Sequence, residues 1–148
     1  FFVSKHCFGI VNTKPIVPGH ILVVTKKVHE RFSDLSSAEV CDLWSTAQLI
    51  GREIEKIYSA SSLTFVIQDG KEAGQTVAHT HVHIIPRKAG DFPVNDDIYD
   101  HLERKRVDST RKDRSLEEMK IEAQSLYEQL KGDSLPLPTQ GWNDSDAM

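Results

Sequence analysis

The stretch Gln75-Thr-Val-Ala-His79-Thr-His81-Val-His83-Ile-Ile-Pro86 places three histidines at every second position. Successive side chains of a β-strand point to opposite faces, so an extended backbone puts His79, His81 and His83 on one surface. Neighbouring rings in this row would be separated by twice the ~3.3 Å rise per residue of a strand. A helix would not align them, because residues two apart do not face each other there. We therefore predict a strand that presents a row of imidazoles.

A loop with two glycines leads directly into this row. Residues 62–68 (SLTFVIQ) are expected to form a strand that ends at Gln68, and the loop after it contains Gly70 and Gly74. Glycine lets the backbone approach a ligand closely, and successive N–H groups in such a loop can form a concavity that binds an anion. Beside three histidines, this loop suggests a phosphate or another anion held against imidazoles.

The segments before the row predict an α+β fold, in which one long helix covers an antiparallel sheet. Residues 7–12 and 20–24 read as short strands, and the connection between them holds two prolines and a glycine, so we expect a hairpin. Residues 36–58 repeat apolar side chains every three to four positions after a capping box, which predicts an amphipathic helix. We expect its apolar stripe to lie on the sheet, with Trp44 in the core.

The segments after the row are more polar. Residues 87–114 are densely charged and contain few apolar anchors, which predicts an extended surface segment with Tyr99 and His101 exposed. A second capping box opens an amphipathic helix over residues 115–131, and we expect one of its faces to pack on the protein through Leu116, Met119, Ala123, Leu126 and Leu130. Residues 132–148 are rich in Pro, Ser, Asp and Gly, and we expect a disordered tail.

Composition limits the function further. The chain has 148 residues, 18 Lys plus Arg against 22 Asp plus Glu, and two cysteines. The length suits one domain, which we assign to residues 1–131. The basic residues are spread along the chain, so nucleic acid is not an expected partner, and no run of about 18 apolar residues suggests a membrane span. The scarcity of cysteine fits a reducing intracellular setting, and we expect a cytoplasmic and also a nuclear location.

Three interpretations of the histidine row compete. The row could face solvent without a chemical role. It could bind zinc, since alternate strand histidines suit tetrahedral ligation with an open position for hydrolysis, although no Asp or Glu lies close by in the sequence to support the ligands. It could act at phosphorus, where a neutral imidazole attacks while neighbouring imidazoles and loop N–H groups stabilise the oxygens. Three of the seven histidines within five residues, beside a glycine loop, disfavour the first interpretation.

The motif His79-Thr-His81-Val-His83-Ile-Ile resembles the histidine-triad (HIT) motif. Residues 68–92 resemble its fragile-histidine-triad branch, the dinucleoside polyphosphate hydrolases, and the likeness extends over about residues 1–130. The resemblance implies a HIT-like, dimeric α+β fold and hydrolysis of diadenosine triphosphate and related dinucleoside polyphosphates to AMP and ADP. It also implies a divalent cation, Mg²⁺ or Mn²⁺, that accompanies the substrate, with no tightly bound cofactor and no metal ligands from the triad.

The resemblance implies a role for each residue of the site. His81 would be the nucleophile that carries a covalent nucleotidyl group, and its other nitrogen would donate to a backbone carbonyl and so fix the tautomer. His83 would contact phosphate oxygens, while His79 and His20 would orient the site. The other expected substrate contacts are Asn12 on a ribose hydroxyl, Gln68, Gly74, Gln75, Thr76 and Val77 on the polyphosphate, and Ile10 and Leu22 on the base.

Some features depart from the branch, and some alternatives stay open. Lys71 stands where the branch often has proline and Ala78 where it often has a basic residue, and relatives have an N-terminal strand ahead of Phe1. A nucleotide-binding signalling module with slow turnover and a zinc-dependent hydrolase are alternatives from other classes. A nucleoside phosphoramidase or adenylylsulfate hydrolase is the alternative within the family. His83 at the third triad position favours hydrolysis over nucleotide transfer, by analogy.

Overall fold

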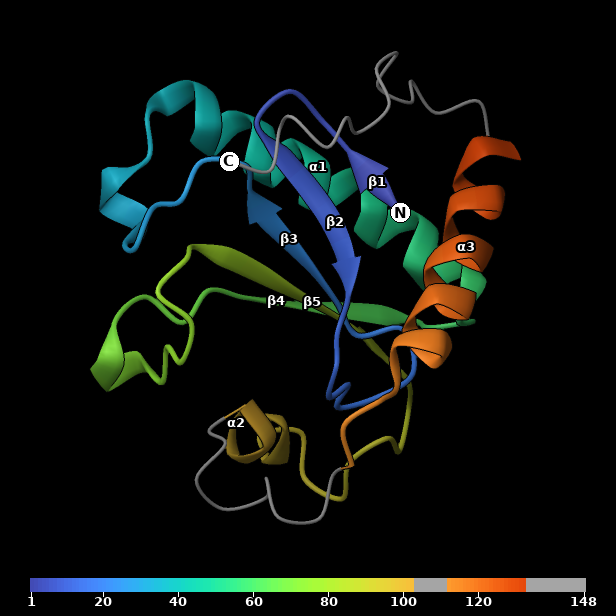
Figure 1. Cartoon of the computed structure of the whole chain (residues 1–148). Helices are drawn as coiled ribbons and strands as arrows, with labels where there is room; N and C mark the ends of the chain where they lie inside the picture. The colour runs from blue at the N-terminus through green and yellow to red at the C-terminus, as the bar shows by residue number, and fades with distance from the viewer. Residues whose placement is uncertain (103–111, 133–148) are drawn as a thin grey trace.

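The structure, a computed structural model, describes residues 1–102 and 112–132. Its centre is a five-stranded antiparallel sheet with the strand order β1-β2-β3-β5-β4 (Figure 1). The strands are β1 Phe2–Val3, β2 Cys7–Val11, β3 Ile21–Thr25, β4 Ser62–Val66 and β5 His81–Arg87. The predicted α+β class and the β2–β3 hairpin are confirmed.

Three α-helices in the described part of the chain accompany the sheet, and the longest lies across one of its faces (Figure 1). They are α1 Ser37–Ile57, α2 Asp97–Leu102 and α3 Leu116–Gly132, with short 3-10 turns η1 Phe32–Asp34 and η2 Lys71–Ala73 in the loops. The predicted capping box opens α1, since the Glu39 N–H donates to Ser36 Oγ and the Glu39 carboxylate accepts from the Ser36 N–H. No helix in the described part of the chain combines the length and apolar character of a membrane span.

The main core lies between α1 and the sheet face that it covers. Its fully buried side chains include Ile21, Val23, Val82 and Ile84 from the strands and Leu43, Ala47, Ile50 and Ile54 from α1. Side chains alternate along a strand, so the neighbours of these residues point to the other face. There β3 sets Leu22 opposite His83 and Val24 opposite His81. The histidines therefore occupy the face that α1 leaves uncovered.

A tight contact fixes the loop between β2 and β3. Gly19 has a φ of +83°, and a Cβ at this position would lie 2.6 Å from the Tyr58 ring at the end of α1. Only glycine fits this combination of backbone angle and space. The contact holds the loop against α1 and brings buried His20 to the start of β3.

Trp44 does not lie in the core, so that prediction is wrong. Its side chain is 41 % exposed and packs edge-on against Phe65, with ring centroids 6.4 Å apart. Phe65 belongs to β4, which is an edge strand and has no neighbour on its outer side among residues 1–102 and 112–132. Leu43 takes the adjacent core position of α1, and Trp44 projects over the uncovered edge of the sheet.

The segment after β5 is more ordered than predicted. Residues 97–102 form α2, and Ile98 and Leu102 are buried in a second apolar cluster with Ile85. The charges before α2 pair with one another, as in the 2.7 Å bond from Arg87 Nε to the Asp91 carboxylate. Tyr99 is exposed, as expected. Residues 103–111 and the predicted tail at 133–148 lie outside the described residues.

The predicted C-terminal helix is present as α3, which packs beside β2 (Figure 1). Leu126 and Leu130 are buried and join the main core. Leu116 is 85 % exposed, so the prediction that it belongs to the packed face is wrong. The first turn of α3 borders a cavity rather than the core, which leaves Leu116 uncovered.

Candidate active site

His81 and His83 lie next to each other on β5, on the sheet face away from α1. Their ring centroids are 4.9 Å apart and the rings are inclined at 66°. A cavity of about 270 Å³ opens over them. Its lining consists of Phe8, Ile10, Leu22, Val24, Gln68, Thr76, Val77, His79, His81 and His83. The structure thus brings the triad, two residues of the glycine loop and an apolar strand surface to one place.

His79 reaches this cavity by another route than the predicted strand. The strand begins at His81, because the N–H and the hydroxyl of Thr80 both donate to the His29 carbonyl, at 2.7 and 3.0 Å, and draw the backbone into a bend. His79 Nε2 then lies 2.7 Å from the Thr25 carbonyl oxygen. The prediction of one continuous row is therefore wrong for His79, although all three rings line one cavity.

A backbone carbonyl holds the His81 ring. His81 Nδ1 lies 2.7 Å from the His79 carbonyl oxygen. A carbonyl oxygen only accepts, so Nδ1 carries the proton and the lone pair of the neutral ring lies on Nε2. The predicted carbonyl partner from the same segment is present. The contact selects the tautomer in which Nε2 can act as a nucleophile.

His20 holds the His83 ring through a short relay of hydrogen bonds. The Ile16 N–H donates to His20 Nδ1 at 3.1 Å, which assigns the proton of neutral His20 to Nε2. His20 Nε2 lies 2.9 Å from His83 Nδ1 and donates to it. The proton of neutral His83 is then on Nε2, where the ring is a donor suited to an anionic oxygen.

Asn12 lies beside this relay, at the end of β2. Its side chain is buried, and Oδ1 accepts from the Lys14 N–H at 2.9 Å. Asn12 Nδ2 is 3.2 Å from His20 Nε2, which already carries a proton, so the two donors are in packing contact and the amide can donate elsewhere. Arg114 donates from Nε to the Asn12 carbonyl at 3.1 Å, and its Nη2 donates to the same oxygen. Arg114 thus ties Asn12 to the segment before α3.

The glycine loop is braced from within. Gly74 has a φ of +86°, and a Cβ there would lie 2.6 Å from Gln68 Nε2, so glycine is what allows Gln68 to lie against the loop. Gln75 Oε1 accepts from the Gly70 N–H at 2.7 Å, and Gln75 Nε2 donates to the carbonyl of Val77 at 3.0 Å. Gln68 and Val77 therefore line the cavity, as expected. The Gln75 side chain does not line it, because its amide is hydrogen-bonded to the backbone of the loop.

An ion pair anchors the start of this loop. Arg31 Nε donates to the Asp69 carboxylate at 3.1 Å, and the Phe32 N–H donates to the same oxygen at 2.8 Å. The hydrogen bond from Arg31 holds the pKa of Asp69 below its usual value. The loop is thereby tied to the turn η1, on the chain between β3 and α1.

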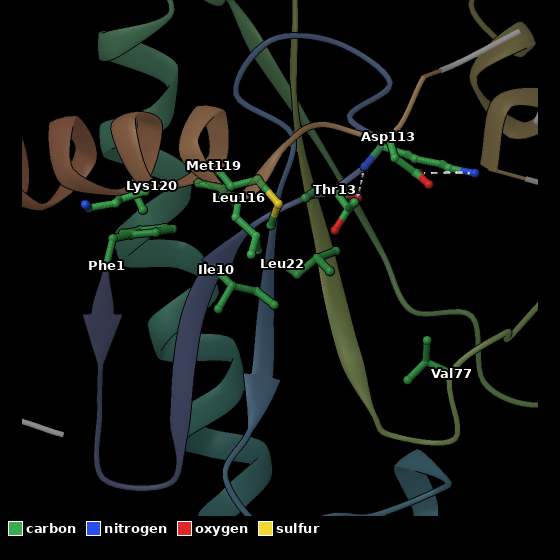
Figure 2. Close-up of a pocket in the computed structure, with 13 residues that line it drawn as sticks. Phe1, Ile10, Thr13, Leu22, Val77, Asp113, Leu116, Met119 and Lys120 are labelled. Atoms are coloured by element: carbon green, nitrogen blue, oxygen red, sulfur yellow. Dashed lines mark hydrogen bonds and ion pairs between the residues drawn. The ribbon is translucent and has the colours of Figure 1, made fainter. Parts of the chain in front are cut away.

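A second cavity, of about 690 Å³, adjoins the first. Ile10, Leu22 and Val77 line both, so the two form one groove. Figure 2 shows Leu116 and Met119 of α3 facing the strand residues Ile10 and Leu22 across this space. The sequence did not reveal this role of α3, because an apolar face that lines a groove has the same spacing as one that packs on a core.

The model of the HIT domain family matches residues 1–90. The chain belongs to the HIT family. Among curated HIT proteins, the bifunctional bis(5'-adenosyl)-triphosphatase/adenylylsulfatase FHIT of Arabidopsis thaliana is 46 % identical over 138 residues, which is 88 % of this chain and 76 % of that protein. The bis(5'-adenosyl)-triphosphatase of Dictyostelium discoideum is 47 % identical over 126 residues, with 85 % and 81 % covered.

Solved HIT structures agree with this fold. The Plasmodium falciparum diadenosine triphosphate hydrolase, in complex with cyclomarin A, is 34 % identical with a TM-score of 0.61, over 74 % of this chain and 76 % of that one. The C. elegans NitFhit protein is 44 % identical with a TM-score of 0.60, over 68 % of this chain and 24 % of that one. The family match ends at residue 90, so α3, which completes the groove, lies outside it.

Proposed function

We propose that this HIT protein hydrolyses diadenosine triphosphate and related dinucleoside polyphosphates to AMP and ADP. The observation that carries the proposal is the bond between His81 Nδ1 and the His79 carbonyl, because it puts the lone pair of the nucleophile on Nε2. Support also comes from the relatives named bis(5'-adenosyl)-triphosphatase, which share 46 and 47 % of the aligned residues with this chain.

The reaction has two displacements. His81 Nε2 attacks the α-phosphorus, a P–N bond forms, and the bond from this phosphorus to the bridging oxygen breaks, so that ADP leaves. Water then attacks the same phosphorus, the P–N bond breaks, and AMP is released while His81 regains its neutral form. The Nε2–H of His83 and the donors of the glycine loop stabilise the charge on the phosphoryl oxygens during both steps.

The groove offers a place for each part of the substrate. Polar contacts to the polyphosphate come from Gln68 and from the backbone of Thr76 and Val77, whereas the expected contact from Gly74 is wrong, because its N–H already donates to the Lys71 carbonyl at 3.0 Å. The Asn12 amide donates to a ribose hydroxyl, His79 and His20 orient the site, and Ile10 and Leu22 flank the base. Gln75 braces this loop, since its amide is already used by the Gly70 N–H and by backbone carbonyls.

The stereochemical course tests this mechanism. A substrate with a chiral phosphorothioate at the attacked phosphorus should give a product with net retention, because two in-line displacements each invert the centre. Chromatography of the products should show AMP and ADP in equal amounts from diadenosine triphosphate. Inversion at phosphorus would mean direct attack by water and would overturn the role of His81.

We propose that Mg²⁺ or Mn²⁺ enters with the substrate, bound to its phosphate oxygens. Within residues 1–102 and 112–132, no three His, Cys, Asp or Glu side chains are grouped so that they could hold a metal ion. His83 Nδ1 accepts from His20, so the neutral His83 ring has no lone pair left for a metal, and this arrangement does not favour zinc ligation by all three triad histidines. Activity lost to a chelator should return with magnesium and not require zinc.

Adenylylsulfate is a second candidate substrate, because the Arabidopsis relative is also named an adenylylsulfatase. The same attack by His81 on the α-phosphorus would expel sulfate in place of ADP. Comparison of kcat/KM for diadenosine triphosphate, adenylylsulfate and a nucleoside phosphoramidate decides the order of preference. A signalling module would show tight nucleotide binding with slow turnover of all three.

We propose that the protein acts in the cytoplasm and nucleus as a dimer. In this dimer, two copies associate through the outer edge of β4. An edge strand presents unpaired backbone groups that a second copy can pair with. Trp44 and Phe65 are 41 % and 38 % exposed at this edge, which gives the pairing an apolar margin. Sedimentation should show a dimer for the wild type and a monomer for Phe65→Lys. A wild-type monomer would contradict the assembly.

A further inference from the structure

His29 links the start of α1 to the triad. It follows β3, and its Nε2 lies 2.9 Å from Glu39 Oε1, with the two side chains only 9 % and 12 % exposed. The other oxygen of Glu39 accepts from the Ser36 N–H at 2.9 Å and from the Ser36 hydroxyl at 2.7 Å. These bonds from Ser36, with a smaller contribution from His29, lower the pKa of Glu39 to about 2. The carboxylate is therefore ionised at neutral pH and accepts a hydrogen bond from His29 Nε2–H.

The backbone of His29 contacts the triad segment. Its carbonyl oxygen accepts from the Thr80 N–H at 2.7 Å and from Thr80 Oγ1 at 3.0 Å. Thr80 is 2 % exposed and stands between His79 and His81 in the sequence. With the ring held by Glu39 and the carbonyl by Thr80, His29 spans the space between α1 and the bend before β5.

One peptide unit carries this link to the nucleophile. The Thr80 N–H and the His79 carbonyl belong to the same planar peptide group, and in a trans peptide they point in opposite directions. The N–H is bonded to His29, and the carbonyl oxygen lies 2.7 Å from His81 Nδ1. Rotation of this plane would therefore move the carbonyl away from the ring that it orients.

We propose that His29, held by Glu39, is a positioning residue that fixes the peptide plane between His79 and Thr80 and so the tautomer of His81. The kinetic consequence rests on the proposed function, whereas the tautomer does not. When the bond between His29 and Glu39 is removed, the plane is less constrained and His81 populates the tautomer with its proton on Nε2. In that tautomer Nε2 has no lone pair with which to attack phosphorus.

Nitrogen-15 NMR of the histidine rings tests the positioning without any substrate. The wild type should show His81 with its proton on Nδ1, while His29→Ala and Glu39→Ala should each show a mixture of tautomers. Glu118→Ala is the matched control. Glu118 occupies the same place in the second capping box, where it accepts from the Ser115 N–H at 2.7 Å and from the Ser115 hydroxyl at 2.8 Å, and within the described residues no hydrogen bond or ion pair joins it to a histidine. Glu118→Ala should leave His81 with its proton on Nδ1, as in the wild type.

Unchanged His81 signals in a folded His29→Ala or Glu39→Ala protein would overturn the proposal. Thermal unfolding of each variant identifies the folded ones, and Glu39→Ala decides the question if His29→Ala does not fold. A tautomer mixture in Glu118→Ala as well would also overturn it, since the effect would then come from general loss of stability.

Kinetics test the consequence for catalysis. With diadenosine triphosphate, His29→Ala and Glu39→Ala should each lower kcat about tenfold with little change in KM, and the double variant should lose no more than either single one. An additive double variant, or an unchanged kcat in a variant with mixed tautomers, would overturn the catalytic consequence. If the wild type does not hydrolyse the substrate, the proposed function fails, while the NMR result still decides the positioning.

Discussion

The three triad rings have the same chemistry but different partners. His81 is held by the His79 carbonyl, His83 by His20, and His79 by the Thr25 carbonyl. Each partner assigns the proton of its ring, which is how one residue type can supply both a nucleophile and a hydrogen-bond donor. The three triad histidines could be predicted as site residues because their alternate spacing is a pattern of the sequence itself. Thr25 could not be predicted, because 54 residues separate it from His79.

At the residue scale, we expect unequal effects from two histidine substitutions. His81→Ala removes the atom that bonds to phosphorus and should lower kcat by about a thousandfold or more, as expected for loss of a nucleophile. His20→Ala removes only the partner of His83 and should lower kcat by about ten- to a hundredfold. Steady-state hydrolysis of diadenosine triphosphate measures both. Equal losses would contradict the division of roles.

The two glycines Gly74 and Gly90 allow a matched comparison. Both have positive φ, at +86° and +76°, so an alanine strains the backbone at either place by about 1 kcal/mol. A Cβ at Gly74 would also meet Gln68 Nε2 at 2.6 Å, whereas at Gly90 it meets nothing within 4 Å. We expect Gly74→Ala to raise KM and Gly90→Ala to leave it unchanged, with similar small losses in denaturation midpoint. Equal KM values for the two variants would show that Gln68 does not contribute to substrate binding.

At the scale of elements, long periodic segments were predictable and short ones were not. The capping boxes at Ser36 and Ser115 correctly marked the starts of α1 and α3. The two residues of β1 and the six of α2 are too few to show a period. Position also matters: Trp44 fits the helical stripe, but only the strand order shows that it lies over an edge strand. The start of β5 at His81 depends on Thr80 and its distant partner His29.

The α1 capping box should make stability depend on pH. The folded-state pKa of Glu39 is lowered from 4.5 to about 2, chiefly by the hydrogen bonds from Ser36. A lowered carboxyl pKa means that the ionised form stabilises the fold above the unfolded-state value, and that this stabilisation is lost as pH falls toward the folded-state value. The stability difference between wild type and Glu39→Gln should therefore be largest near neutral pH and shrink between about pH 4.5 and 2, as denaturant titrations would show. A stability difference that stays constant over this pH range would contradict the lowered pKa of Glu39.

At the scale of the whole molecule, α3 connects the outer layer of the protein to the groove. Arg114 bonds the Asn12 carbonyl and the Glu122 carboxylate, and Glu122 also accepts from the Tyr58 hydroxyl at 2.7 Å. Burial, followed by this bond, raises the pKa of Tyr58. Asn12, α1 and α3 are thus joined by one network. This network could not be predicted from sequence patterns, since its members come from three distant segments of the chain.

This network predicts a defect in substrate binding rather than in chemistry. Arg114→Ala removes the donors that fix the Asn12 backbone, so KM for diadenosine triphosphate should rise by about tenfold while kcat changes little. Lys131→Ala, at the far end of α3, serves as the control and should have neither effect. A fall in kcat with an unchanged KM would contradict the placement of Asn12 on the substrate.

The central claim is that His81 becomes bonded to phosphorus during turnover. Brief reaction with diadenosine triphosphate, followed by quench in an alkaline denaturant that preserves a P–N bond, proteolysis and mass spectrometry, tests it directly. The peptide that contains His81 should carry an added AMP group, and this adduct should be absent in His81→Asn. If an actively hydrolysing enzyme gives peptides without a nucleotide, or with the nucleotide on a residue other than His81, then His81 is not the nucleophile.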